Sequence, residues 1–242
     1  MLKFSNVHMK FDKEILSNFN LEVKKGEFLS ILGPSGSGKS TLLRLASKIL
    51  DPSKGSVEYR DQKEPLIGFV FQEPTLMPWR DVLSNVILPI EIKHNKNQFT
   101  KDYALEWLER VGLKGKENNF PDELSGGQKM RVSIARSLVQ GCDLLLLDEP
   151  FSALDEVTRR RLEDDLLEIW EKEKFTVLFV THSVSEAIYL SQRIIVLSSG
   201  PAEIIDESLI NYHGSKKDFS ESKEFQEINN NIYDKLEKGI RE

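Results

Sequence analysis

The chain of 242 residues has a single cysteine and no long apolar run. With only Cys142 present, no intrachain disulfide can form, and a reducing compartment is the expected location. The apolar neighbours of Cys142 indicate a buried, unreactive thiol, because free cysteine is among the most buried residue types. No segment approaches the roughly 18 to 20 apolar residues that span a bilayer. The sequence therefore predicts a soluble, cytoplasmic protein.

The chain also lacks an excess of positive charge, since its formal net charge is −6. Nucleic-acid binding needs a basic patch that faces the phosphates, so no nucleic acid is expected as the main partner. Residues 1–12 lack the apolar core of a signal peptide. The length predicts one domain, or one domain with an inserted subdomain.

Strand-like and helix-like patterns alternate along the chain. The continuous apolar runs FLSILG, LLLLD and TVLFVT are typical of buried strands. Helical periodicity is present at residues 81–92, 99–113 and 125–139, with proline and glycine between these stretches. The alternation predicts an α/β fold whose parallel sheet is covered on both faces. Beyond residue 213 the sequence is polar, with one amphipathic helical pattern at 224–238.

The segment GPSGSGKST matches the P-loop pattern G-x-x-x-x-G-K-[ST] and lies between an apolar strand and a helix. Its glycines let backbone N–H groups face phosphate oxygens, and the helix start adds partial positive charge. We expect Lys39 to reach the terminal phosphates and the Ser40 hydroxyl to ligate Mg²⁺. The alternative, a plain glycine-rich turn, does not account for Lys-Ser in register behind a strand. The predicted phosphate-binding residues are Gly33, Pro34, Ser35, Gly36, Ser37, Gly38, Lys39, Ser40 and Thr41.

Two acidic residues follow the buried run of four leucines. Asp148 and Glu149 come at the carboxyl end of this strand, where ligands gather in open α/β sheets. Asp148 can hold the Mg²⁺ shell, and Glu149 can polarise a water for attack on a γ-phosphate. Alone, two acids after an apolar run often mark only a strand end. Together with the P-loop they predict a catalytic site.

The motif LSGGQ indicates which kind of P-loop protein this is. By itself, Ser125 followed by Gln128 is a capping box that starts a helix. With the P-loop before it, and with DEP, SALD and VTH after it in order, the chain resembles the ATP-binding cassette (ABC) ATPases. The resemblance covers about residues 2 to 210 and implies ATP as the bound nucleotide, together with Mg²⁺.

The resemblance implies a P-loop NTPase of the ABC-ATPase fold. Residues 1–212 would form the ATPase domain, with a RecA-like core and an antiparallel β subdomain. An α-helical subdomain would be inserted at about residues 76–140. Residues 213–242 would form a polar, helical extension.

Individual roles also follow from the resemblance. Gln72 is similar to the Q-loop glutamine that senses Mg²⁺ and the attacking water, and His182 to the switch histidine at the γ-phosphate. Asp155 in SALD resembles the D-loop aspartate, which communicates across a dimer. Phe11 falls where an aromatic ring stacks on adenine, with an ordinary core phenylalanine as the alternative. The implied Mg²⁺ ligands are Ser40, Gln72 and Asp148, and the implied catalytic residues are Lys39, Gln72, Glu149 and His182.

In the family that the chain resembles, LSGGQ closes on the nucleotide of a partner subunit. The residues concerned would be Ser125, Gly126, Gly127 and Gln128. One cassette per chain therefore implies a dimer with two ATP molecules between its subunits, either two copies of this chain or this chain with a paralogue. ATP-driven closure of that dimer would be the power stroke.

The segment FQEPTLMPWRDVLSNV resembles importers of the nitrate, sulfonate and taurine type, a group that also imports thiamine precursors. The resemblance implies an integral membrane permease and, indirectly, a periplasmic or lipid-anchored substrate-binding protein. The chain would then lie peripherally on the inner face of the cell membrane. Trp79 would face the permease, and the alternative is a buried anchor of the helical subdomain.

Three positions depart from that group. Gln128 and Met130 are exchanged, Ser183 replaces an acid after His182, and Gln192 stands where an aspartate is usual. Two other functions stay open: a soluble ABC ATPase without a membrane partner, and a subunit of an ABC exporter. The chain has neither the two cassettes of translation factors nor the long coiled coils of repair ATPases.

Overall fold

The computed structural model describes residues 1–60, 64–93, 101–212 and 215–241. It consists of two compact units. The first unit comprises Met1–Glu64 and Thr176–Glu242, and the second comprises Pro65–Phe175. Residues 99 and 100 of the predicted helix at 99–113, and His213 at the start of the polar tail, lie outside the described residues.

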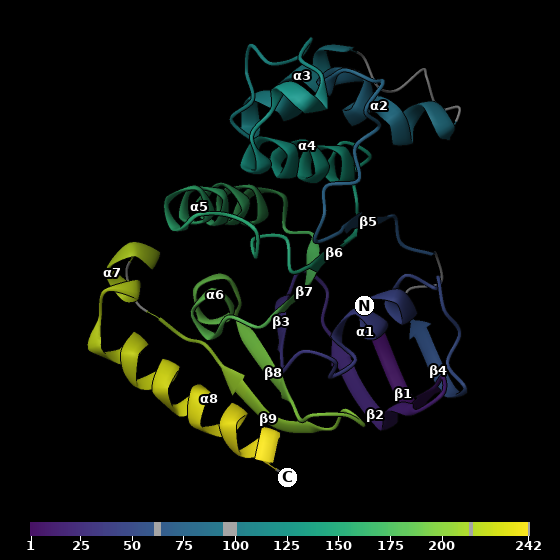
Figure 1. Ribbon diagram of the computed structural model, residues 1–242, viewed down its shortest axis with the longest axis vertical. Coiled ribbons are helices and arrows are strands. Elements are labelled where there is room, and N and C mark those ends of the chain that lie inside the picture. The colour runs from purple at the N-terminus through teal and green to yellow at the C-terminus, as the bar shows by residue number, and fades with distance from the viewer. Residues whose placement is uncertain (61–63, 94–100, 213–214, 242) are drawn as a thin grey trace. The chain divides into compact units, whose positions relative to one another are not determined.

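An antiparallel sheet forms the N-terminal part of the first unit (Figure 1). Its central strand β1 (Leu2–Lys10) pairs with β2 (Glu14–Val23) on one side and with β4 (Lys54–Tyr59) on the other. Side chains alternate between buried and more exposed along β1, as expected for a sheet with one covered face. On the buried face, Phe4 meets Phe19 edge to face at 5.8 Å between ring centroids.

The remaining strands of the first unit are fully buried or lie at an edge. β3 (Phe28–Leu32) lies between β7 (Thr176–Thr181) and β8 (Arg193–Leu197), and all three are parallel. Every residue of these strands is buried, which confirms the parallel sheet predicted from the continuous apolar runs. β9 (Ile204–Leu209) pairs antiparallel with β8. The sequence does not predict β9, because its charged residues interrupt the apolar pattern.

The helices of the first unit cover this sheet. α6 (Val184–Leu190) packs against β3 and β7, and α8 (Lys223–Arg241) packs against α6, β8 and β9. α1 (Lys39–Ala46) contacts β7, and α7 (Lys216–Ser220) precedes α8. Figure 1 shows α8 in yellow beside β8 and β9. The helix predicted at 224–238 is therefore confirmed within α8.

The second unit is mostly helical. The short strand β5 (Ile67–Val70) pairs parallel with β6 (Leu144–Asp148). α4 packs against α2, α3, α5 and β5, so it is the central helix of this unit. These elements are α2 (Val82–Ile92), α3 (Lys101–Arg110), a 3₁₀ turn (Pro121–Glu123), α4 (Gly126–Leu138) and α5 (Glu156–Glu173).

The cysteine of the chain lies between α4 and β6. Cys142 is buried, and burial raises the pKa of its thiol to about 12, which confirms the unreactive cysteine. In the part of the chain that the structure describes, none of the helices combines the length and apolar character that a membrane span requires.

A buried ion pair fixes the start of β8 in the first unit. Arg193 Nη1 lies 3.0 Å from Glu27 Oε1, and both side chains are less than a tenth exposed. Arg193 Nη2 also donates to the carbonyl of Glu22, and Glu27 Oε2 accepts from the N–H of Lys24. Arg193 Nε also lies 3.1 Å from Glu207 Oε1. The two buried charges are thus satisfied by one another, by backbone groups and, for Arg193, by Glu207.

We expect Arg193→Met to lower the free energy of unfolding by about 3 to 5 kcal/mol, because it leaves the Glu27 charge buried without a partner. Arg60→Met is the control, since Arg60 pairs with Glu22 at 2.6 Å on the surface and such pairs contribute up to about 1 kcal/mol. Urea denaturation measures both. Equal losses for the two variants would contradict the structural role of the buried pair.

Candidate nucleotide-binding site

The P-loop connects the end of β3 to the start of α1 in the first unit. Gly36 and Gly38 have φ angles of +80° and +84°, in the left-handed region that favours glycine. Gly38 is required for a second reason, because a Cβ there would lie 2.8 Å from Ile15 Cγ2. The glycine spacing of the motif is therefore a requirement of the loop itself.

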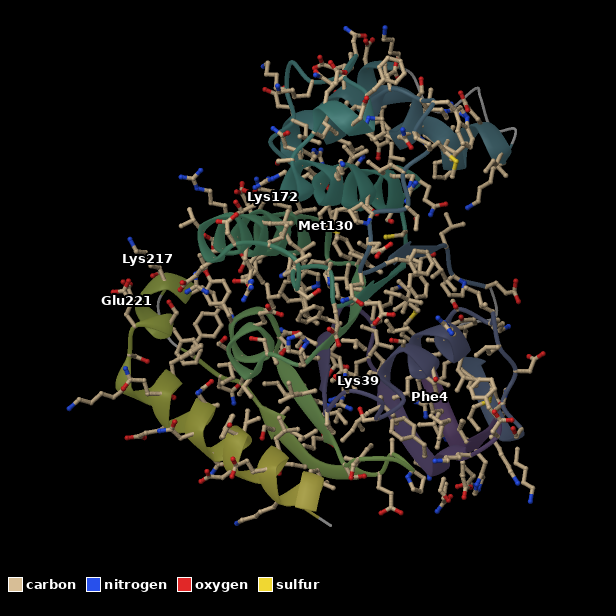
Figure 2. The ribbon with its side chains drawn as sticks, viewed as in Figure 1. Phe4, Lys39, Met130, Lys172, Lys217 and Glu221 are labelled. Carbon is tan, nitrogen blue, oxygen red and sulfur yellow. The ribbon has the colours of Figure 1, made fainter. Side chains whose placement is uncertain are left out.

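Lys39 and Ser37 give this loop the character of an anion site. Lys39, labelled in Figure 2, is buried, and its Nζ donates to the carbonyls of Gly33 and Pro34 at 2.8 and 2.9 Å. Ser37 Oγ is buried without a hydrogen-bond partner among the described residues. A buried ammonium, a buried hydroxyl and the first N–H groups of a helix all favour a negatively charged ligand. These donors fit a phosphate group.

His182 follows the strand next to the P-loop strand. Leu32 at the end of β3 lies opposite Thr181 at the end of β7, so Gly33 and His182 leave the same edge of the sheet. Thr181 Oγ1 donates to Glu186 Oε2 at 2.6 Å, and Thr181 Oγ1 accepts from the N–H of Ser183. This network orients the turn that presents the exposed His182 side chain.

Two features of that turn were not recognised in the sequence. Thr181 and Glu186 brace it, although nothing in a Thr-x₄-Glu spacing signals such a contact. Ser183 is the N-cap of α6, where its side chain accepts from the N–H of Glu186.

Phe11 lies directly after β1 in a tight turn, where its N–H donates to the carbonyl of Lys13. Its side chain is 53% exposed. The alternative of an ordinary core phenylalanine is therefore wrong. An exposed ring is what stacking against a planar base requires.

In the second unit, three predicted residues lie near one another. β5 and β6 are parallel with Val70 opposite Leu147, so Gln72 and Asp148 leave the same edge. Gln72 Nε2 donates to Ser152 Oγ at 3.3 Å, and Ser152 Oγ donates to the carbonyl of Glu149 at 2.9 Å. Ser152 thus links the Q-loop glutamine to the backbone of the predicted base, a link that the sequence did not reveal.

Glu149 has an unusual backbone conformation. Its φ is +45°, in the left-handed region that costs a residue with a Cβ of the order of 1 kcal/mol or more. Such strain persists where the surrounding structure holds it, and it occurs often at functional sites. Here the hydrogen bond from Ser152 to the Glu149 carbonyl is one of the contacts that hold this turn.

The LSGGQ residues form the start of α4. Ser125 Oγ accepts from the N–H of Gln128, and Gln128 Oε1 accepts from the N–H of Ser125, so the capping box is present. Gln128 thus serves the helix start, while Met130 is buried in the second unit (Figure 2). A Cβ at Gly127 would lie 2.5 Å from Thr158 Cγ2, whereas one at Gly126 would meet nothing closer than 3.9 Å.

Asp155 is also engaged in the start of a helix. It is the N-cap of α5, and its Oδ1 accepts from the N–H of Thr158 at 3.0 Å. Hydrogen bonds from the side chain and backbone of Thr158 hold the pKa of Asp155 below its usual value. The Asp155 carboxylate is therefore ionised and fixed in direction at neutral pH.

Hydrogen bonds fix the backbone of the loop that carries Trp79, whereas the Trp79 ring is exposed. Trp79 is 74% exposed, so the alternative of a buried anchor is wrong. The fully buried Asn85 accepts from the N–H of Met77 and donates to the carbonyls of Met77, Arg80 and Asp81. Arg80 in turn pairs with Glu91 at 2.6 Å. An exposed aromatic ring on a fixed backbone is typical of a contact surface.

The predicted site residues are thus divided between the two units. Phe11, the P-loop and His182 belong to the first unit. Gln72, Asp148, Glu149, Asp155 and the LSGGQ residues belong to the second.

Comparison with known proteins decides the family. The ABC transporter family matches residues 16–152, more than half of the chain. The chain belongs to the ABC transporter family. The aliphatic sulfonates import ATP-binding protein SsuB of Bacillus subtilis (strain 168) is 41% identical over 228 residues, which cover 93% of this chain and 88% of that protein. The trimethylamine N-oxide transport system ATP-binding protein TmoW of Pelagibacter ubique is 42% identical over 205 residues, covering 79% and 60%.

Solved structures of ABC cassettes agree with this assignment. The dimeric post-hydrolysis state of the ATP-binding cassette MJ0796, bound to ADP and Pi, matches with a TM-score of 0.76 and 34% identity. The match covers 88% of this chain and all of that one. The ABC-ATPase fold expected from the sequence is confirmed, and the chain is an ATP-binding cassette with ATPase activity.

Gly126 and Gly127 of the LSGGQ motif allow a matched test of how tightly the start of α4 is packed. We expect Gly127→Ala to lower ATPase activity and the free energy of unfolding, the latter by about 1 to 3 kcal/mol, because its methyl overlaps Thr158 Cγ2. Thr158→Ser in the same chain removes that methyl and keeps the hydroxyl, so it should restore both. Gly126→Ala is the control for stability. Chemical denaturation and ATP turnover measure the outcome, and no rescue by Thr158→Ser would contradict the packing role.

Proposed function

We propose that this ABC ATPase binds Mg·ATP through the P-loop and hydrolyses it with Glu149 as the general base. The observation that carries the proposal is the P-loop itself. In it the buried Lys39 ammonium and the Ser37 hydroxyl, which has no hydrogen-bond partner among the residues that the structure describes, converge with the start of α1. Lys39 would move from the loop carbonyls to the terminal phosphates and neutralise charge in the transition state. Phe11 would stack on the adenine.

The other predicted site residues would bind Mg²⁺ or act on the attacking water and the γ-phosphate. The Ser40 hydroxyl, the Gln72 amide oxygen and the Asp148 carboxylate are hard oxygen ligands of the kind that Mg²⁺ prefers. Bound Mg²⁺ would neutralise charge on the β- and γ-phosphates. Gln72 would sense the metal and the attacking water, Glu149 would accept that water's proton, and His182 would contact the γ-phosphate.

We further propose that two chains share the ATP sites. The N–H groups at the start of α4, preceded by Ser125, form a second anion-binding helix start. Asp155 would contact the partner subunit. The structural relative MJ0796 is dimeric with ADP and Pi bound, which supports closure of two cassettes around nucleotide. Either two copies of this chain or this chain and a paralogue would make the pair.

The Trp79 loop is the proposed docking surface for a membrane permease. Its backbone is fixed by Asn85, and its ring is exposed, so the surface is preformed for a partner helix. The relatives SsuB and TmoW are named for import and transport. We therefore propose an importer subunit on the inner face of the cell membrane.

The solute would be a small molecule of the nitrate, sulfonate, taurine or thiamine-precursor type, delivered by a periplasmic or lipid-anchored binding protein. In domain terms, we propose that residues 1–212 form the ATPase domain, with a helical subdomain inserted at about 76–140. Residues 213–242 would be its extension.

We expect Glu149→Gln to lower ATP turnover by at least about 100-fold, because the amide cannot accept the proton of the attacking water. ATP binding should persist, and ATP should then hold a dimer that sedimentation can detect. Lys39→Ala is the contrasting variant and should lose ATP binding itself. Normal turnover by Glu149→Gln would show that another group is the base.

Trp79→Ala should weaken permease binding by about 30-fold, since a central aromatic contact contributes about 2 kcal/mol. ATP affinity of the purified chain should change little, because the ring is exposed. Tyr233→Ala, another exposed aromatic, is the control. Pull-down with the permease in detergent and uptake in vesicles measure the effect. Unchanged binding and uptake would contradict the docking surface.

A further inference from the structure

The C-terminal helices α7 and α8 are packed on the first unit and not extended into solvent. Phe219 and Ile232 are buried in one apolar cluster, and Phe225, Ile228 and Leu236 pack against it. Figure 1 shows α8 running along the sheet beside β9. The sequence alone predicted the helix but not the surface that it covers.

That cluster lies directly behind both phosphate-facing segments of the first unit. Its other members include Leu32, the residue before Gly33, and Val184, two residues after His182. Ala187 and Ile188 of α6 belong to it as well. The apolar face of α8 therefore supports the strand that leads into the P-loop and the helix that follows the switch histidine.

The N-terminal end of this region is held by a cation in an aromatic environment. Lys216 Nζ lies 4.2 Å from the ring centroid of Tyr212, 5.8 Å from that of Tyr189 and 5.9 Å from that of Phe219. Tyr189 belongs to α6. Cation–π contacts of partly desolvated lysines stabilise such an arrangement, so α7 is fixed to α6.

The C-terminal end is held by Gly239. The carbonyl of Gly239 accepts from Ser199 N–H at 3.2 Å and from Ser199 Oγ at 3.3 Å. Gly239 is buried, and a Cβ there would lie 2.3 Å from Ile205 Cδ1 and 3.7 Å from Ser198 Cα. One turn earlier, Lys235 pairs with Asp206 at 2.8 Å. The end of α8 thus lies close to Ile205 of β9 and to the turn after β8.

The same turn lies against the back of the P-loop. A Cβ at Gly33 would lie 3.1 Å from Leu197 Cβ, and one at Gly200 would lie 3.8 Å from the carbonyl oxygen of Gly36. Ser199 stands between Leu197 and Gly200 in the chain. Residues 197–200 therefore lie between Gly239, which Ser199 contacts by hydrogen bonds, and the P-loop residues Gly33 and Gly36.

We propose that α7 and α8 act as a strap that positions the P-loop, and that Ser199 and Gly239 are positioning residues for ATP binding. Gly239 holds Ser199 in place, and residues 197–200 then fix the back of the loop whose N–H groups face phosphate. This inference rests on the proposed role of the P-loop. It adds a function for the C-terminal extension.

Gly239→Val tests the strap, because the branched side chain overlaps Ile205 and separates the end of α8 from Ser199. We expect the Kd for a fluorescent ATP analogue and the KM for ATP to rise about five- to tenfold, equivalent to about 1 to 1.4 kcal/mol. kcat should change less than about twofold, since the strap positions ground-state phosphate contacts. Ser199→Ala, which removes one of two hydrogen bonds, should raise Kd in the same direction by about twofold.

Two further chains make the test specific. Lys238→Val places the same side chain on the exposed neighbouring position and should leave Kd unchanged. Ile205→Ala, combined with Gly239→Val, makes room for the new side chain and should restore Kd. Thermal unfolding followed by circular dichroism establishes that each chain is folded at the assay temperature. If Gly239→Val is unfolded at that temperature, the Kd of Ser199→Ala for the ATP analogue tests the proposal instead.

The proposed strap is wrong if Gly239→Val binds ATP with the Kd of the parent chain, or if Ser199→Ala does so where Gly239→Val is unfolded. It is also wrong if Lys238→Val raises Kd as much as Gly239→Val. A failure to rescue with Ile205→Ala also contradicts it. Lys39→Ala separates this failure from failure of the proposed function. If Lys39→Ala abolishes ATP binding while the strap variants are silent, the P-loop site stands and the strap does not. If Lys39→Ala binds normally, the proposed function itself is wrong.

Discussion

The parallel pairing of β3 with β7, with Leu32 opposite Thr181, is the constraint on which the phosphate site of the first unit depends. It makes the P-loop and the His182 turn leave one edge of the sheet side by side. The pairing is stable because every residue of both strands is buried. A shift in register would move His182 along the sheet relative to Gly33, by roughly 3.3 Å for each residue. Backbone geometry, more than any single side chain, therefore sets the distance between these two groups.

Both glycine-rich motifs contain a glycine whose backbone lies too close to a neighbouring side chain for a Cβ to fit, but the neighbour differs between them. In the P-loop, Gly38 combines a left-handed φ with a contact that a Cβ would make with Ile15. In the signature, Gly127 is required by Thr158 of α5, while the space around Gly126 is open. One signature glycine thus joins α4 to the helix capped by Asp155, and the other leaves the helix start accessible to an anion. The strap formed by α7 and α8 extends the same principle, because Gly239 meets Ile205.

The sequence predicted what is local and missed what is tertiary. The P-loop, the buried strands, the capping box at Ser125 and the helix within α8 each have a short-range pattern that physical chemistry can interpret. β9 has no such pattern, because the adjacent charges of Asp206 and Glu207 interrupt its apolar residues. Gln72 lies 77 positions before Glu149 and 80 before Ser152, and Ser199 lies 40 positions before Gly239. No spacing rule reveals contacts between residues so far apart in the sequence. The exposure of Phe11 and Trp79 could not be predicted from the sequence either, since an aromatic ring fits a buried core as well as a binding surface.

The central claim is that each ATP site combines the P-loop of one chain with the signature of another. Complementation between two inactive chains tests this most directly. Lys39→Ala lacks a working P-loop, and Gly126→Asp places a carboxylate at the start of α4 where phosphate would bind. Each variant alone has two defective sites, whereas a mixed dimer has one intact site. We expect mixing of the two chains to restore ATP turnover. Turnover no greater than the sum of the separate variants would contradict it.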